Sequence, residues 1–71
     1  MDNRIKKLKE EIRMDNLKLQ EETKYYQMAL ALRQDTVWYH RENMARIRNH
    51  IRMLEQEVRF LEREEEKRLA K

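Results

Sequence analysis

Two histidines, His40 and His50, are the residues of this sequence best suited to bind a metal ion or to transfer a proton near neutral pH. They lie ten residues apart, and neither has a carboxylate or a second histidine four residues away, the spacing that places two ligands on one helix face. The chain also has no cysteine. The sequence therefore predicts no metal and no cofactor, and it leaves His40 as a pH-sensitive group or, more simply, as a histidine tolerated in a core.

Acidic residues are plentiful, and paired carboxylates often serve enzymes as acid and base. Such a pair needs a water-poor pocket that shifts its pKa values and holds a substrate. We expect carboxylates on an extended, solvated helix to lack that pocket. The sequence also has no glycine with which to build a phosphate-binding loop. The sequence therefore predicts that the chain is not an enzyme.

The elements that carry these side chains are predicted to be helical throughout. The 71 residues are 44% charged and 39% hydrophobic, and they include no glycine, no proline and no serine. Turns favour these three residue types together with asparagine and aspartate, whereas leucine, methionine, glutamate, lysine, arginine and glutamine favour helix. The expected fold class is all-α, with residues 1–71 forming a single long helix of about 105 Å in a coiled coil.

A strict heptad repeat occupies residues 37–61. Apolar residues recur every seven positions, and a second set recurs three residues after the first, with His40 as its polar member. This spacing is typical of the a and d positions of a coiled coil, and the pattern continues toward the N-terminus. The predicted oligomer seam consists of Leu19, Tyr26, Leu30, Val37, Met44, Ile47, Ile51, Leu54, Val58 and Leu61.

The spacing changes near residues 22–30. A three-then-four spacing begins at Ile5, whereas two successive four-residue steps connect Glu22, Tyr26 and Leu30. Such an insertion is a stutter, which locally unwinds a left-handed supercoil. We expect a stutter at this point of the coiled coil.

The two ends of the chain carry opposite charges. Residues 4–13 include five basic and two acidic residues, and residues 55–66 include six acidic and two basic residues. Antiparallel pairing joins opposite charges, so we expect an antiparallel homodimer or a four-helix assembly. A parallel dimer is an alternative, because β-branched a residues with leucine at d favour it. A helical hairpin that turns at residues 34–36, with Asp35 or Thr36 as helix cap, is the other alternative.

A second apolar face is centred on residues 25–39. Positions that face water in a simple dimer carry large apolar residues here, so the middle of the helix is expected to contact more than one neighbour. The neighbour is another copy in a four-helix assembly, a different helical protein, or another part of a longer protein to which this segment belongs. The residues predicted for this docking face are Tyr25, Leu32, Trp38 and Tyr39.

A cluster of arginines gives the alternative function, nucleic-acid binding. The residues concerned are Arg41, Arg46, Arg48 and Arg52. Residues 43–61 resemble the basic region and zipper of the basic leucine-zipper transcription factors, and the resemblance implies a basic helix that contacts DNA. In that family the basic region precedes the zipper, whereas here Met44, Ile47 and Ile51 occupy the seam within the basic stretch. A net charge of only +3 predicts weak, salt-sensitive binding, so nucleic acid is the less favoured partner.

The function favoured by the sequence is a coiled coil that mediates self-association of a larger scaffold, as a dimer or a tetramer. The scaffold is expected to be cytoskeletal, centrosomal, trafficking-related or chromosome-associated. No apolar run approaches the roughly 20 residues that span a bilayer, and the first residues lead into charge rather than into a signal-peptide core. We therefore expect no membrane association and an intracellular location, cytoplasmic or nuclear.

Overall fold

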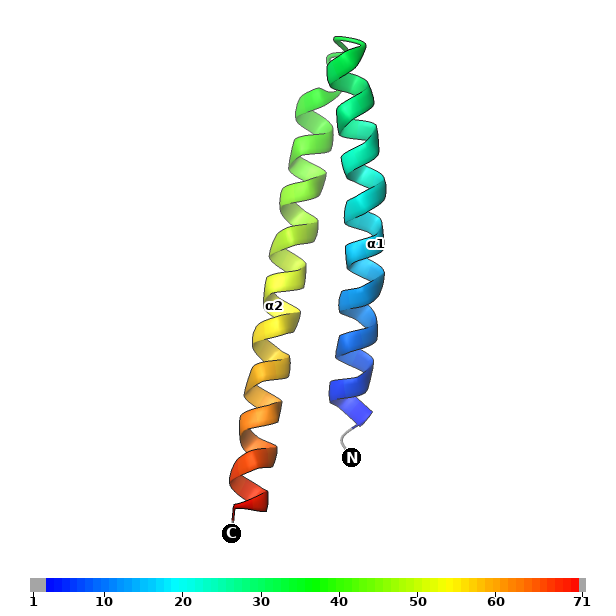
Figure 1. Ribbon diagram of the computed structural model, residues 1–71. Helices are drawn as coiled ribbons and strands as arrows, with labels where there is room; N and C mark the ends of the chain where they lie inside the picture. The colour runs from blue at the N-terminus through cyan, green and yellow to red at the C-terminus, as the bar shows by residue number, and fades with distance from the viewer. Residues whose placement is uncertain (1–2, 71) are drawn as a thin grey trace.

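A computed structural model describes residues 3–70 as two long helices, α1 (Asn3–Ala31) and α2 (Val37–Leu69). The described residues are 91% helical and contain no strand. The helices lie side by side and run in opposite directions, with the connecting turn at one end and the two ends of the chain at the other (Figure 1). The predicted all-α class is confirmed.

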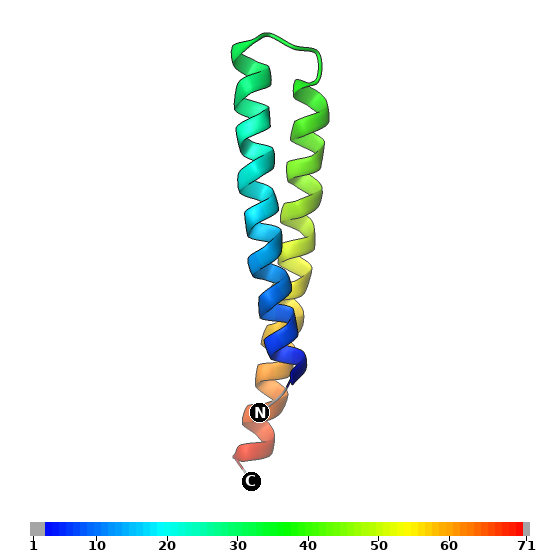
Figure 2. The ribbon, with the colours of Figure 1, turned by 90° about the vertical axis from the view of Figure 1, so that its right-hand side faces the viewer.

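The chain folds back on itself at residues 32–36, which form the arch between the helices in Figure 2. The molecule measures 59 × 15 × 12 Å, well short of the rod of about 105 Å expected for a continuous helix. The single long helix favoured by the sequence is therefore not confirmed. The structure has the helical hairpin that the sequence left as an alternative.

The turn begins with a capping motif that ends α1. The amide of Gln34 donates to the carbonyl of Ala29 at 2.9 Å, and the amide of Arg33 donates to the carbonyl of Leu30 at 3.2 Å. These two bonds form a Schellman motif, which requires a left-handed residue after the helix. Arg33 fills that position with φ 54°, where glycine is the usual residue. An arginine thus makes a turn that the composition did not suggest.

The start of α2 is capped less completely. Thr36 is the N-cap residue, but its backbone is already helical and its side chain makes no capping hydrogen bond. Its hydroxyl lies 3.5 Å from the side-chain oxygen of Gln34 instead, so the predicted cap by Thr36 is not formed. At the other end of α2, Lys67 and Arg68 lie in the last turn, where positive charge is favoured by the helix dipole.

The core lies between the two helices and is thin. Four residues of α2 are buried there, Met44, Ile51, Leu54 and Val58, together with Ala29 of α1. The larger apolar residues of α1 that share this inner face are only partly buried. They are Ile5, Leu8, Ile12, Leu19 and Tyr26. With only two helices, each inner side chain is covered mainly from one side, because no third element packs over it.

Candidate interaction surfaces of the hairpin

The predicted seam residues lie mostly on the inner faces of the hairpin. Met44, Ile51, Leu54 and Val58 are buried there, as already described. A second group is partly buried, namely Leu19, Tyr26, Val37, Ile47 and Leu61. These residues join two helices of one chain in this structure, so the prediction that they join different chains stays a prediction.

Leu30 is placed differently from the other seam residues. It is 48% exposed, whereas its neighbour Ala29 is 1% exposed. Ala29 follows Tyr26 on the inner face after three residues, so the three-then-four spacing of α1 continues within the hairpin up to the turn. Ala29 is therefore the last residue of α1 that is buried against α2 before the turn.

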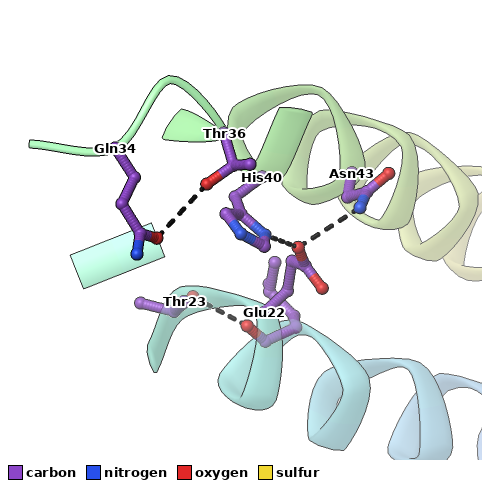
Figure 3. A network of polar contacts seen from close by, with 7 residues as sticks. Glu22, Thr23, Gln34, Thr36, His40 and Asn43 are labelled. Carbon is purple, nitrogen blue, oxygen red and sulfur yellow. Dashed lines mark hydrogen bonds and ion pairs between the residues drawn. The ribbon is translucent and has the colours of Figure 1, made fainter. Parts of the chain in front are cut away.

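Glu22 links the two helices near the turn. Its Oε1 lies 2.5 Å from Nδ1 of His40 and accepts a hydrogen bond from Nδ2 of Asn43 at 3.2 Å (Figure 3). The side chains of His40 and Glu22 are 20% and 18% exposed. The hydrogen bond from His40 is the main reason that the pKa of the Glu22 carboxyl is lowered, partial burial opposes the shift, and Asn43 adds to it. Glu22 is thus held as a carboxylate that accepts from two residues of α2.

Asp15 makes a second link farther from the turn. It is the buried charged residue of the described chain, at 8% exposure, and its Oδ2 pairs with Nδ1 of His50. His50 itself remains about half exposed. A buried carboxylate without a partner is strongly destabilising, so this contact satisfies Asp15. Apolar contacts have no preferred direction, and we expect the two histidine–carboxylate pairs to fix the register of α1 against α2.

These two links were not predicted from the sequence. His40 and His50 were recognised as chemically distinctive, but their carboxylate partners lie eighteen and thirty-five residues away in the chain. A signal was present, because Asp15 and Glu22 follow Ile12 and Leu19 by three residues and therefore fall on the apolar side of their helix. Acidic residues at such positions indicate a polar partner on the facing helix.

Aromatic side chains surround His40 at the turn end of the hairpin. Its ring centroid lies 6.1 Å from that of Tyr25, in a stacked arrangement, and 5.6 Å from that of Tyr39. Trp38 lies edge-on to Tyr39 at 6.3 Å. Because Tyr25 belongs to α1 and Tyr39 to α2, contact with the same histidine places the two tyrosines on one side of the hairpin.

The predicted docking face is exposed to solvent. Tyr25, Leu32, Trp38 and Tyr39 are 53%, 63%, 62% and 53% exposed. Leu32 lies in the turn region rather than in a helix, and the other three lie on α1 or α2. The structure thus leaves all four side chains available for a partner, and it does not test whether one binds.

An outer stripe of apolar residues runs along α1 and continues into the first residue of the turn. It consists of Met14, Leu17, Tyr25, Met28 and Leu32, each 46% to 63% exposed. At about 100° of rotation per residue, the stripe lies roughly 140° around α1 from the centre of the inner face. The described chain also has a shallow hollow on this stripe, lined by Met14, Leu17, Lys18, Gln20, Glu21 and Lys24. The docking face predicted from the sequence includes only the part of the stripe near the turn, Tyr25 and Leu32.

The four arginines of the alternative function are all exposed on α2. Helical geometry places Arg41, Arg48 and Arg52 on one side of α2 and Arg46 more than about 100° away from them. The structure therefore brings three of the four together along one strip. Arg59 lies on the same strip, near the carboxylate of Glu55 at 3.9 Å.

No protein family, no curated protein and no solved structure matches the chain. Within residues 3–70, neither helix has a segment long and apolar enough to cross a membrane, and side chains of metal-binding type do not gather in groups of three or more. The function is therefore inferred from the geometry of the hairpin.

Proposed function

We propose that this chain is a protein-interaction element, a helical hairpin that self-associates and so joins the chains of a larger scaffold. The observation that carries the proposal is the number of large apolar side chains that the hairpin exposes to solvent. Eleven large apolar side chains are exposed in residues 3–70, whereas five apolar residues are buried. Large exposed apolar patches in a soluble protein mark sites of association, and this hairpin exposes more large apolar side chains than it fully buries.

The small size of the chain supports the same proposal. A domain of about 70 residues buries too small a fraction of its surface to be comfortably stable alone, and two helices cover each other on one side only. A second hairpin can cover the exposed sides and complete a four-helix assembly, as in helical bundles in general. Fully burying a large apolar side chain contributes roughly 1.5–3 kcal/mol, so covering the exposed half contributes about 1 kcal/mol.

The wider setting of this element is inferred from the sequence. The scaffold is proposed to be cytoskeletal, centrosomal, trafficking-related or chromosome-associated, and the location to be cytoplasmic or nuclear. A different helical protein that binds at Tyr25, Leu32, Trp38 and Tyr39 is the other partner consistent with the exposed aromatic residues.

The experiment that tests self-association is sedimentation equilibrium over a wide range of protein concentration. The chain has a mass of 9.0 kDa, and the proposal predicts that the average mass rises toward a dimer or a tetramer as concentration increases. Circular dichroism at the same concentrations reports whether helix content rises with mass. A helical species that stays monomeric up to about 1 mM, which corresponds to a free energy of about −4.1 kcal/mol, would exclude self-association of functional strength.

Nucleic-acid binding is the second candidate function, and one observation favours it. Arg41, Arg48 and Arg52 lie along a single exposed strip of α2, so several guanidinium groups can meet one phosphate backbone together. The test is a gel shift with generic duplex DNA at increasing salt. Binding that weakens steeply with salt and is reduced by Arg48→Gln with Arg52→Gln supports this candidate, and no shift at low salt excludes it.

A further inference from the structure

The outer stripe of α1 is spaced symmetrically along the helix. Met14 lies nine residues before position 23 and Leu32 lies nine residues after it, and Leu17 and Met28 lie six before and five after it. Side chains placed in this way face one another when two copies of the helix pair antiparallel about position 23. A register shifted by about one turn, centred on position 21, also matches apolar side chains, Met14 with Met28 and Leu17 with Tyr25, but it sets Glu21 level with Glu21 of the second copy.

The charges on the stripe favour the same arrangement. Glu21 interrupts the apolar side chains, and Lys24 borders them. Antiparallel pairing about position 23 sets Glu21 of one copy within one residue, about 1.5 Å along the helix axis, of the level of Lys24 of the other, and the twofold symmetry repeats this contact. Parallel pairing instead sets Glu21 against Glu21 and Lys24 against Lys24, which is unfavourable.

The hollow on the stripe matches the opposite end of a copy in this register. It is lined by residues that include Leu17, Lys18 and Glu21, and antiparallel pairing brings Met28 of the second copy to this level. Methionine is flexible and fills irregular apolar gaps well. The exposed tyrosines beside His40 lie on one side of the hairpin, so Tyr39 of α2 adds apolar surface next to Tyr25 of the stripe.

The outward face of α2 is a less suitable surface for the same purpose. Trp38, Met53 and Phe60 are exposed there. Polar residues recur among them every seven positions, at Glu42, Asn49 and Gln56, so no continuous apolar stripe forms.

We propose that the outer stripe of α1 is the self-association surface, that its occupant is the outer stripe of a second copy, and that the two α1 helices pair antiparallel about position 23. This inference rests on the proposed function, because it specifies how the self-association takes place. The two α1 helices form the centre of the assembly, and the two α2 helices lie on its outside. Each hairpin thereby presents its α2 arginine strip to solvent.

Charge reversal tests the register directly. Glu21→Lys places lysine against Lys24 of the second copy, and Lys24→Glu places glutamate against Glu21, so each variant alone should associate about tenfold more weakly than the wild type. An equimolar mixture restores two opposite-charge contacts, and it should form a heterodimer about as tight as the wild-type dimer. Arg48→Glu, a reversal on the other side of the hairpin, is the matched control and should leave the affinity unchanged.

Cysteine cross-linking tests the orientation independently, because the chain has no native cysteine. Met14→Cys mixed with Leu32→Cys should give a disulfide-linked heterodimer in high yield. Met14→Cys alone should give little product, because in the antiparallel register the two copies of position 14 lie at opposite ends of the stripe. Efficient cross-linking of Met14→Cys alone would overturn the antiparallel arrangement.

The outcomes separate this inference from the proposed function. A wild-type chain that associates, with both charge-reversed variants equally tight and no gain on mixing, would overturn the inference and leave self-association standing on another surface. A wild-type chain that stays monomeric would overturn the proposed function and the inference together. Circular dichroism of each variant checks that helix content is retained, so that loss of association is not loss of folding.

Discussion

Replacing Arg33 with glycine should stabilise the hairpin. Arg33 sits at φ 54° in the capping motif that ends α1, and the two hydrogen bonds that define the motif involve backbone groups only. Glycine can make the same bonds without the clash between Cβ and the backbone that disfavours left-handed residues. The change leaves the turn intact and removes its local strain.

The size of the effect follows from two opposing contributions. The left-handed conformation disfavours a residue with Cβ by roughly 1–2 kcal/mol. Glycine removes this cost, but it also makes the unfolded chain more flexible, which lowers the free energy of unfolding by about 0.5–1 kcal/mol. The expected net stabilisation of Arg33→Gly is about 0.5–1 kcal/mol, which raises the midpoint of thermal unfolding by roughly 2–8 °C in a chain of this size.

The assay is urea and thermal unfolding followed by circular dichroism, at one fixed protein concentration because association adds to stability. Arg33→Ala is the matched control, since it removes the same side chain but keeps Cβ, and its stability should remain close to that of the wild type. If residues 32–36 instead continued a single helix, glycine would destabilise the chain by about 1 kcal/mol relative to alanine. An Arg33→Gly variant less stable than Arg33→Ala would therefore refute the hairpin turn.

Three further predictions concern the inner face. The pKa of Glu22 is lowered in the folded chain, so its contribution to stability is present above its unfolded pKa of about 4.5 and is lost as the pH falls through the lower folded value. Glu22→Gln should therefore reduce the loss of unfolding free energy between about pH 5 and pH 2. An unchanged pH dependence would contradict the His40 contact. Leu54→Ala should lower the free energy of unfolding by about 2–3 kcal/mol in urea, because Leu54 is buried. Phe60→Ala, at an exposed position, should lower it much less. Equal decreases for the two variants would show that Leu54 is not in the core. His50→Ala leaves the buried Asp15 without its partner and should lower the free energy of unfolding by about 1–3 kcal/mol. Asp15→Asn introduced into that variant should recover part of the loss. No recovery would mean that Asp15 is solvated.

The helical class follows directly from the sequence, and so do several core residues. The absence of glycine and proline leaves the chain few ways to stop being helical, and the heptads of residues 37–61 place Ile51, Leu54 and Val58 on one face. A face that is apolar in the sequence needs a partner, but periodicity does not say whether that partner belongs to the same chain. For this reason the residues of the interface were easier to predict than the arrangement of the helices.

The turn at residues 32–36 and the two histidine–carboxylate pairs could not be predicted from the spacing of apolar residues. The turn depends on Arg33 adopting a conformation that arginine seldom takes, and residue type alone gives no warning of it. The pairing of Glu22 with His40 and of Asp15 with His50 becomes predictable only once the helices are known to fold back on each other in one register. Apolar spacing indicates which face is buried, whereas the facing residue depends on where the chain reverses.

The central claim is that one chain forms a hairpin whose outer surfaces are left for association, and an intramolecular distance tests it most directly. Spin labels at Glu10→Cys and Glu57→Cys, on exposed positions of α1 and α2, report this distance when the doubly labelled chain is diluted into excess unlabelled chain. The hairpin predicts a separation on the order of 20 Å, because packed helices have axes about 8–10 Å apart and the labels add their own length. A separation near 70 Å, the length of 47 residues of continuous helix, would contradict it.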